Sequence, residues 1–372
     1  MFASCLGAIT GEDNRLALPA AERVVAVLVD GLGTVNIRAA AGHAPFLNRG
    51  ITASKAISAG FPTTTAASIT SFATGLSAGQ HGIVGYKVLD PETQQPVNQL
   101  TGWSKEISAL KWQPNQTIAE KAQLSGVAAY AVGPSEYENS GFTALTMRGA
   151  KYLPADSLHE RVDTTLSLLA SSKSTLIYFY VPELDQKAHA FGVNSPQWLQ
   201  ELENLESAMS KLSSALTDKR FNKSGAVLTA DHGIIDVPRE NHIYLDELTL
   251  PNLKLVAGDP RANYLYLADD IDEEGALAEA DKLQRQLDAT KLGRGARVLT
   301  RQQVIEAKWF GAQVTEVAKS RMPDLFAIAV ARTALYHRDF APAKSLKMIG
   351  QHGSISAEEF SIPLIKFGAL AN

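Results

Sequence analysis

The sequence predicts an α/β fold with a largely parallel central sheet, helices on both of its faces and a smaller inserted subdomain. Two observations lead to this prediction. Short apolar runs, which read as buried strands, alternate with segments of helical period, as in chains built from βαβ units. Aspartate and histidine recur directly after several of these runs, at the strand ends where ligands bind in open α/β sheets.

Five apolar runs are predicted to be strands, and four segments of helical period are predicted to be helices. The strands are Val24–Val29, Val127–Val132, Thr175–Val181, Ala226–Ala230 and Leu325–Val330. The helices are Thr65–Thr74, Ser157–Ser171, Pro196–Leu216 and Glu274–Ala289. In the last helix, apolar residues recur at near-helical spacing with charged residues between them: Leu277, Ala280, Leu283 and Leu287.

Three segments are predicted along the chain. Residues 1–237 form the main α/β core and carry most of the candidate functional residues, and residues 346–372 return to that core. Residues 238–345 are interpreted as an inserted cap or subdomain, although they could instead continue the main sheet and its helices. Within them, Pro323-Asp324 before the last predicted strand indicates a re-entry into the main sheet.

The composition excludes several classes of function. Of 372 residues, 45% are hydrophobic and 20% are charged, which is enough to bury a sizeable core. The net charge of −4 and the pI near 6.1 argue against nucleic-acid polymers and membrane surfaces as partners. A small anionic substrate is still compatible, because bound divalent cations can be the largest local charges in a site.

The compartment is predicted from what the sequence lacks. No apolar run approaches the ~18–20 residues of a membrane span. Met1–Thr10 has no basic start followed by a long apolar stretch, so secretion is not indicated. Cys5 is the only cysteine, which excludes disulfides within the chain and a multi-thiolate metal site. We therefore expect a cytoplasmic protein, of an oligomeric state that the sequence does not indicate.

Candidate metal ligands follow the predicted strands. Asp231-His232-Gly233 comes directly after a strand, where Gly233 eases a turn that lets both side chains address one cation, although such a pair is often a surface loop. Asp185 and His189 lie on one face if the chain is helical there, with a salt-bridged loop as the alternative. With Asp30 and His352 they make six ligands, which suits two cations roughly 4 Å apart.

Asp30-Gly31-Leu32-Gly33 admits a second interpretation, a dinucleotide-binding fingerprint. That motif also requires a glycine at position 36, where this chain has Asn36. A carboxylate at the end of the first strand fits a metal ligand better than a partial glycine motif.

The segment from Pro62 to Thr65 supplies hydroxyl groups at the start of a predicted helix. A helix N-terminus is the positive end of the macrodipole, where an alkoxide or a phosphate oxygen is favoured. A threonine hydroxyl is a weak nucleophile, so it needs a base or a metal ion. The alternative is that Thr63 or Thr64 only caps the helix.

Together these motifs resemble the nucleotide pyrophosphatase/phosphodiesterase branch of the alkaline phosphatase superfamily. The resemblance runs from Asp30 to His352 with the motifs in the family's order. They are Pro62-Thr63-Thr64-Thr65, Thr74-Gly75-Leu76, His81-Gly82-Ile83, Glu183-Leu184-Asp185 through His189, Asp231-His232-Gly233 and His352-Gly353. By this resemblance the fold is alkaline-phosphatase-like and Thr65 takes the position of the catalytic threonine.

The resemblance also implies a division of ligands between two divalent metal ions. Asp185, His189 and His352 would hold one, while Asp30, Asp231 and His232 would hold the other, with the Thr65 oxygen completing its shell. Three imidazoles and three carboxylates suit Zn²⁺, with Mn²⁺ or Fe²⁺ as alternatives. The implied mechanism is two in-line displacements through a phosphothreonine, with net retention at phosphorus.

Two departures from the family pattern bear on substrate preference. Close relatives carry an asparagine after His-Gly-Ile-x-x, where it donates to a phosphoryl oxygen, and this chain has Tyr86. Ala66-Ala67-Ser68 follows the nucleophile, where many relatives have the bulkier Phe-Pro-Asn. Whether the Tyr86 hydroxyl replaces the asparagine stays open, and so does the shape of the neighbouring pocket.

The leading hypothesis is a metal-dependent phosphodiesterase or nucleotide pyrophosphatase that acts on a small phosphorylated substrate. A phosphomonoesterase or phosphonate hydrolase of the same superfamily is the alternative enzyme. A sulfatase would need Cys or Ser in a Cys/Ser-x-Pro-x-Arg context, which is absent from the sequence. A non-enzymatic protein with structural metals is disfavoured, because structural zinc sites saturate their ligands and leave no adjacent nucleophile.

Overall fold

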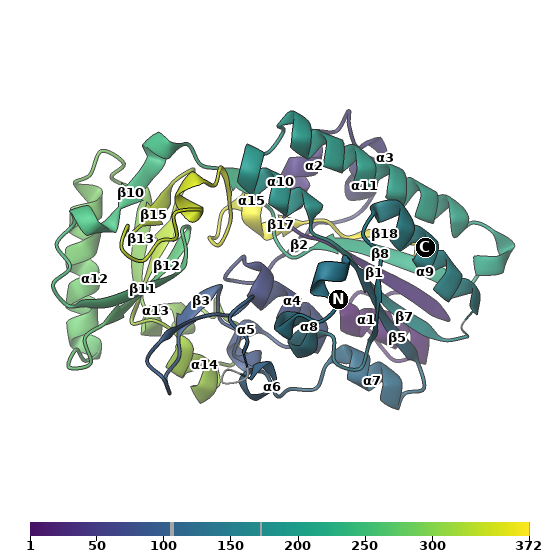
Figure 1. Ribbon diagram of the computed structural model, residues 1–372, viewed down its shortest axis with the longest axis horizontal. Helices are drawn as coiled ribbons and strands as arrows, with labels where there is room; N and C mark the ends of the chain where they lie inside the picture. Colours follow the sequence, from purple (N-terminus) through teal and green to yellow (C-terminus); the bar gives the residue numbers. More distant parts are fainter. Residues whose placement is uncertain (105–107, 172, 372) are drawn as a thin grey trace.

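A six-stranded sheet forms the centre of the larger part of the molecule in the computed structural model, which describes residues 1–104, 108–171 and 173–371 (Figure 1). Its strand order is β18-β8-β1-β7-β5-β6. The strands are β1 (Arg23–Val29), β5 (Ala128–Gly133), β6 (Lys151–Pro154), β7 (Thr175–Val181), β8 (Ser224–Ala230) and β18 (Ile365–Gly368). All neighbours pair in parallel except β18, which runs antiparallel to β8 at the edge. The predicted α/β class with a largely parallel sheet is confirmed.

Helices cover both faces of this sheet, because the side chains of each strand alternate between two cores. On β1, Val25, Val27 and Val29 pack into one core with the helices on that face, which are α2 (Thr34–Ala39), α3 (Pro45–Ala53), α9 (Leu158–Ser171), α10 (Glu183–Phe191) and α11 (Pro196–Ala215). Val24, Ala26 and Leu28 pack into the other core with α1 (Phe2–Thr10), α4 (Thr65–Thr74) and α7 (Ile118–Leu124). α8 (Gly141–Thr146) lies beside α4.

A second sheet lies within residues 238–345, at the other end of the molecule in Figure 1. It is antiparallel, in the order β11-β12-β14-β13, with β11 (Leu253–Asp259), β12 (Ala262–Leu267), β13 (Ala296–Thr300) and β14 (Leu325–Ala329). One face packs on α12 (Glu273–Asp288). The other face shares a core with residues from the region between Phe61 and Trp112, so this sheet also receives part of the N-terminal half of the chain.

The strand at Leu325 is where the sequence interpretation is wrong. We predicted that Pro323-Asp324 leads back into the main sheet, but β14 pairs with β12 and β13 in the second sheet. Every residue of β14 is buried. Because an apolar run is the same whichever sheet buries it, only its pairing partners decide where it belongs.

Short elements join the two sheets and complete the fold. Short helices at the second sheet and its neighbourhood are α5 (Ala78–His81), α6 (Ala109–Trp112), α13 (Arg301–Glu306) and α14 (Glu316–Arg321). Two-stranded pairs are β2 (Ile57–Ser58) with β17 (Ser361–Ile362), β3 (Lys87–Leu89) with β4 (Pro96–Asn98), β9 (Ile235–Asp236) with β16 (Gly350–Gln351), and β10 (His242–Tyr244) with β15 (Ala334–Tyr336). The helix α15 (Ala357–Phe360) lies at the junction between the two sheets. Among the described residues, no helix combines the length and the apolarity that crossing a membrane requires.

Candidate active site

The first group of predicted ligands lies at the carboxyl ends of two neighbouring strands. β1 and β8 pair in register, with Val29 opposite Ala230, so the residues that follow them, Asp30 and Asp231, lie side by side. The His232 Nε2 atom is 3.5 Å from Asp30 Oδ1 and 3.4 Å from Asp231 Oδ2. All three side chains are buried. We call Asp30, Asp231 and His232 the first triad.

The second group combines a helix with a loop from the C-terminal part of the chain. Asp185 and His189 lie one turn apart on α10, as the i, i+4 spacing predicted, with His189 Nε2 3.2 Å from Asp185 Oδ2. β16 pairs with β9, just after the first triad, and thereby delivers His352 to the same place. The His352 Nε2 atom is 3.8 Å from Asp185 Oδ1. We call Asp185, His189 and His352 the second triad.

The two triads face each other. The imidazole rings of His232 and His352 stack with 3.8 Å between their centroids, so one histidine of each triad touches the other triad. At Gly31, directly after Asp30, a Cβ atom would lie 2.9 Å from the Asp185 side chain, and the backbone there is left-handed with φ 69°. Glycine at this position therefore lets the first triad approach the second.

Each of the three histidines has one ring nitrogen that is hydrogen-bonded to a backbone carbonyl. The Nδ1 atoms of His189, His232 and His352 lie 2.7, 3.1 and 2.8 Å from the carbonyl oxygens of Gly350, Gly233 and Thr63, respectively. A carbonyl can only accept, so each Nδ1 carries the proton and donates it. Nε2 of each ring then faces the carboxylates and, once it carries no proton, is the atom that can bind a metal.

The carboxylates show that the site fits cations. Asp185 Oδ1 and Asp231 Oδ2 are buried and have no hydrogen-bond donor among the described residues, which is costly for an anionic oxygen. Burial and then the Asp185 charge raise the pKa of Asp231 to about 7, and burial together with the other two carboxylates raises the pKa of Asp30. In each triad the ligand atoms lie within 4.8 Å of one another, so a metal ion at each would neutralise these charges.

The predicted nucleophile lies against the first triad. Thr65 is the first residue of α4, and its side chain is buried. Its Oγ1 atom is 3.4 Å from Asp30 Oδ1 and 3.3 Å from His232 Nε2. The two preceding threonines do not share this place: Thr64 is the N-cap residue without a side-chain capping bond, and the Thr63 hydroxyl donates to the Ser354 carbonyl, 2.8 Å away.

Tyr86, which stands where the family has an asparagine, is half-buried. Burial raises the pKa of its phenol, and a hydrogen bond with Asn98 partly offsets that rise. The Asn98 bond gives the hydroxyl a partner within the protein. A role for Tyr86 in holding a phosphoryl oxygen stays a prediction.

Tyr180 is a site residue that the sequence interpretation missed. Its hydroxyl donates to Asp30 Oδ2 at 2.6 Å, and burial followed by the Asp30 charge raises the pKa of the phenol well above its usual range, so it remains a donor. It is the penultimate residue of β7, within an apolar run. Nothing in the local pattern separates Tyr180 from Tyr178, and only the parallel pairing of β1 with β7 places it beside Asp30.

We predict that Tyr180→Phe weakens metal binding at the first triad by about 10- to 100-fold, because partners that orient a ligand typically contribute that much. The affinity is measured by titrating Zn²⁺ into metal-free protein against a chelating indicator. Tyr178→Phe is the matched control, since its ring stacks on Tyr180 while its hydroxyl makes no hydrogen bond with either triad among the described contacts. Equal affinity in the two variants would contradict the prediction.

Comparison with known proteins agrees with this geometry. The family model for type I phosphodiesterase/nucleotide pyrophosphatase matches residues 24–355, which is most of the chain and includes both triads. The chain belongs to this family. The predicted family is thereby confirmed.

Two curated relatives match about half of the chain. A Schizosaccharomyces pombe protein described as an uncharacterized pyrophosphatase/phosphodiesterase is 27% identical over 204 residues, 53% of this chain and 41% of the relative. Human ectonucleotide pyrophosphatase/phosphodiesterase family member 1 is 24% identical over 206 residues, 53% of this chain and 22% of the relative. The matched stretch therefore covers less than half of either relative.

Solved structures of the phosphodiesterase family show the same fold. An inactive variant of murine ectonucleotide pyrophosphatase/phosphodiesterase 5 in complex with AMP has a TM-score of 0.70 at 17% identity, covering 94% of this chain and 88% of the murine chain. The human counterpart has a TM-score of 0.68 at 18% identity, covering 93% and 88%. These structures confirm that the predicted alkaline-phosphatase-like fold is correct.

Proposed function

We propose that the chain is a metal-dependent hydrolase that cleaves phosphodiester or pyrophosphate bonds of nucleotides or other small diesters. The proposed route is a phosphothreonine at Thr65. One observation carries the proposal: the buried Thr65 hydroxyl, at a helix N-terminus, is within 3.4 Å of two side chains of the first triad, which in turn stacks on the second triad. Family membership supports the class of reaction, and the murine relative that holds AMP supports a nucleotide as one substrate.

Two divalent ions, one in each triad, are the proposed cofactors. Zn²⁺ suits a set of three imidazoles and three carboxylates best, with Mn²⁺ or Fe²⁺ as alternatives. When bound, such ions lower the pKa of an adjacent hydroxyl and offset the negative charge that develops in phosphoryl transfer.

The described residues then divide the work of two displacements. Asp30 and His232 orient the Thr65 hydroxyl, which loses its proton to solvent, and Oγ1 attacks phosphorus while the bond to the leaving oxygen breaks. The first triad is buried, whereas Asp185 and His189 of the second triad are partly exposed, which leaves a route for water and for the proton. In the second step water attacks phosphorus from the vacated side, the bond from phosphorus to Oγ1 breaks, and Thr65 regains a proton. Two inversions give net retention.

The charge of the site favours a diester over a monoester. Three carboxylates leave two divalent ions with one net positive charge, which a diester monoanion matches better than a monoester dianion. No Lys or Arg occurs between Phe61 and Tyr86, the stretch around the nucleophile. Arg261, an arginine distant in the sequence, is fully buried and paired with Glu359, so it does not supply a cation to the phosphoryl group.

We therefore predict a higher kcat/KM for bis(p-nitrophenyl) phosphate than for p-nitrophenyl phosphate. Enzymes specialised for monoesters usually add a cationic side chain, often a bidentate arginine, and neither the Phe61–Tyr86 stretch nor Arg261 supplies one here. The comparison is made at one metal loading. A preference for the monoester of roughly tenfold, about 1.4 kcal/mol in the barrier, would favour the phosphomonoesterase or phosphonate hydrolase alternative instead.

A further inference from the structure

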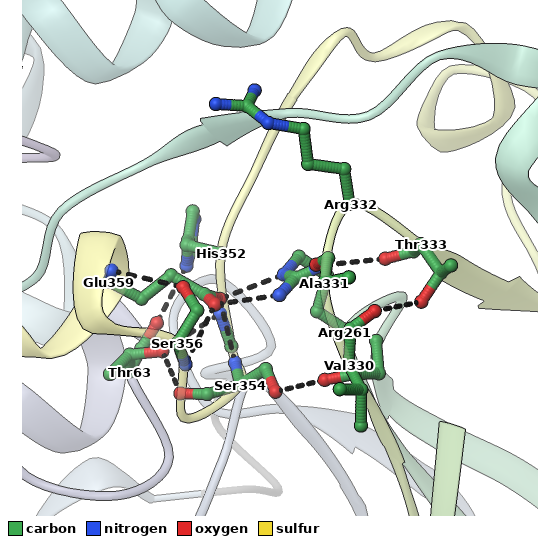
Figure 2. Close-up of polar contacts among 12 residues, drawn as sticks. Thr63, Arg261, Val330, Ala331, Arg332, Thr333, His352, Ser354, Ser356 and Glu359 are labelled. Atoms are coloured by element: carbon green, nitrogen blue, oxygen red, sulfur yellow. Dashed lines mark hydrogen bonds and ion pairs between the residues drawn. The ribbon is translucent and has the colours of Figure 1, made fainter. Parts of the chain in front are cut away.

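A buried ion pair between Arg261 and Glu359 lies at the junction of the two sheets (Figure 2). Arg261 follows β11 in the second sheet, and Glu359 is on α15, 98 residues later. The contact is bidentate, with Arg261 Nε 2.9 Å from Glu359 Oε1 and Nη2 2.8 Å from Oε2. Both side chains have no exposed surface. Arg261 Nη1 also donates to the carbonyls of Ala331 and Thr333.

Stability alone is a weak reason for such a pair. Removing two charges from water costs free energy that their attraction often fails to return, and well-packed apolar residues of similar volume do as well or better. The same pair does fix the positions of its two side chains, because a planar guanidinium that binds a carboxylate through two hydrogen bonds allows one geometry. The backbone that Glu359 binds therefore shows what the pair holds in place.

The Glu359 carboxylate binds the loop that follows His352. The Ser354 amide donates to Oε1 at 2.8 Å, and the Ser356 amide donates to Oε2 at 3.3 Å. Ser354 also donates its hydroxyl to the Ala329 carbonyl at the end of β14. The loop carrying a ligand of the second triad is thus attached to the second sheet, through Arg261 and through β14.

Thr63 joins this loop to the nucleophile segment. Its carbonyl accepts from His352 Nδ1 at 2.8 Å. Its hydroxyl accepts from the Gly353 amide at 3.0 Å and donates to the Ser354 carbonyl at 2.8 Å. Figure 2 shows Thr63 and His352 on the Glu359 side of the network. His352 is therefore bonded to Thr63, which lies two residues before Thr65 in the chain. The loop that carries His352 is in turn held by Glu359 and Arg261.

Gly233, directly after the first triad, contacts the same helix through its backbone. The Gly233 amide donates to the Glu359 carbonyl at 2.8 Å, and a Cβ on Gly233 would lie only 2.0 Å from the Glu358 carbonyl oxygen. Changing the Glu359 side chain leaves this contact in place. The hydrogen bonds of the Glu359 side chain therefore act on the loop of the second triad. Removing them should lower metal affinity at the second triad and leave the first triad unchanged.

We propose that Arg261 and Glu359 are positioning residues that hold His352 in the second triad and align it with Thr65. The proposal rests on the proposed function, since it assumes that both triads bind metal. Partners that orient a metal ligand typically change metal affinity by about 10- to 100-fold. We expect a loss of that size at the second triad when the pair is removed, with the first triad close to its wild-type affinity.

The test compares variants by Zn²⁺ titration of metal-free protein and by thermal unfolding of the same metal-free samples. The double variant Arg261→Met/Glu359→Leu removes both charges and is expected to fold. Glu359→Gln alone leaves the buried Arg261 charge without a compensating negative charge and is expected to be less stable. Thr63→Val replaces the hydroxyl with a methyl group of similar size. It tests the last link separately and guards against a double variant that fails to fold.

Arg148→Met/Glu120→Leu is the matched control. Arg148 also binds one carboxylate and several carbonyls, those of Gln113, Leu145 and Asn115, and none of these partners belongs to a triad. A merely structural role predicts that both double variants change the unfolding temperature and neither changes Zn²⁺ affinity.

The expected result is one weakened Zn²⁺ site, in the Arg261/Glu359 double variant and in Thr63→Val, with turnover restored by excess Zn²⁺. Two wild-type Zn²⁺ affinities in folded forms of both variants would overturn the positioning role while leaving the proposed function intact. A wild-type protein that binds no Zn²⁺ at the triads is a different outcome. It would contradict the proposed function, and with it the positioning role.

Discussion

Replacing Thr65 with alanine is expected to reduce turnover of bis(p-nitrophenyl) phosphate by about 10³-fold or more while both metal ions stay bound. Loss of a nucleophile commonly costs several orders of magnitude in turnover. The Thr63 hydroxyl is bonded to Gly353 and Ser354, whereas Thr65 Oγ1 lies within 3.4 Å of both Asp30 and His232. The measurement is kcat at saturating Zn²⁺, together with metal content.

Thr70→Ala is the control for this substitution. Thr70 is a buried threonine on the same helix α4, and its hydroxyl donates to the Ala66 carbonyl one turn earlier. It should fold slightly less stably and keep its activity. Rapid acid quenching of wild-type protein with substrate should trap phosphate on Thr65, detected by mass spectrometry of the peptide. Near-normal turnover in Thr65→Ala, or phosphate trapped on another residue, would show that the assignment of the nucleophile is wrong.

Thorough chelation is expected to abolish activity, and Zn²⁺ or Mn²⁺ is expected to restore it. The buried carboxylate oxygens of Asp185 and Asp231 have no donor among the described residues, so the metal-free site keeps uncompensated negative charge. Ions that bind only the folded chain also stabilise it, by about 2.7 kcal/mol for each site when free metal is 100 times its Kd. The unfolding temperature should therefore fall on chelation and recover with metal.

Two observations separate a metal-dependent enzyme from one that chelation merely unfolds. Circular dichroism of the metal-free protein should retain the folded signal at the assay temperature, and metal analysis of the reactivated protein should give two ions for each chain. Full turnover by a folded, metal-free preparation would be incompatible with a reaction that depends on both triads.

Much of the fold could be predicted from the sequence, because the patterns that define it are local. β1, β7 and β8 are continuous apolar runs, as expected for strands buried on both faces. Asp30, Asp231 and His232 follow two of these strands directly, so knowing the strands was enough to place them at one edge of the sheet. The i, i+4 spacing of Asp185 and His189 likewise needed only a helical turn.

Other features depend on pairing between distant segments, and local pattern could not supply them. β14 reads as a main-sheet strand until its partners β12 and β13 are known. Tyr180 differs from Tyr178 only through its distance from Asp30, which follows from the pairing of β1 with β7. Arg261 is enclosed at the junction of the sheets, and its partner Glu359 lies 98 residues later in the chain.

The sequence by itself determined the family of the chain and its candidate ligands, because the types of ligand and their places after strands are written in consecutive residues. The tertiary structure decided how the ligands are held. His352 reaches the second triad because β16 pairs with β9, and Glu359 and Thr63 hold its loop there. Such contacts join residues far apart in the chain, and their geometry exists only once the two sheets have packed together.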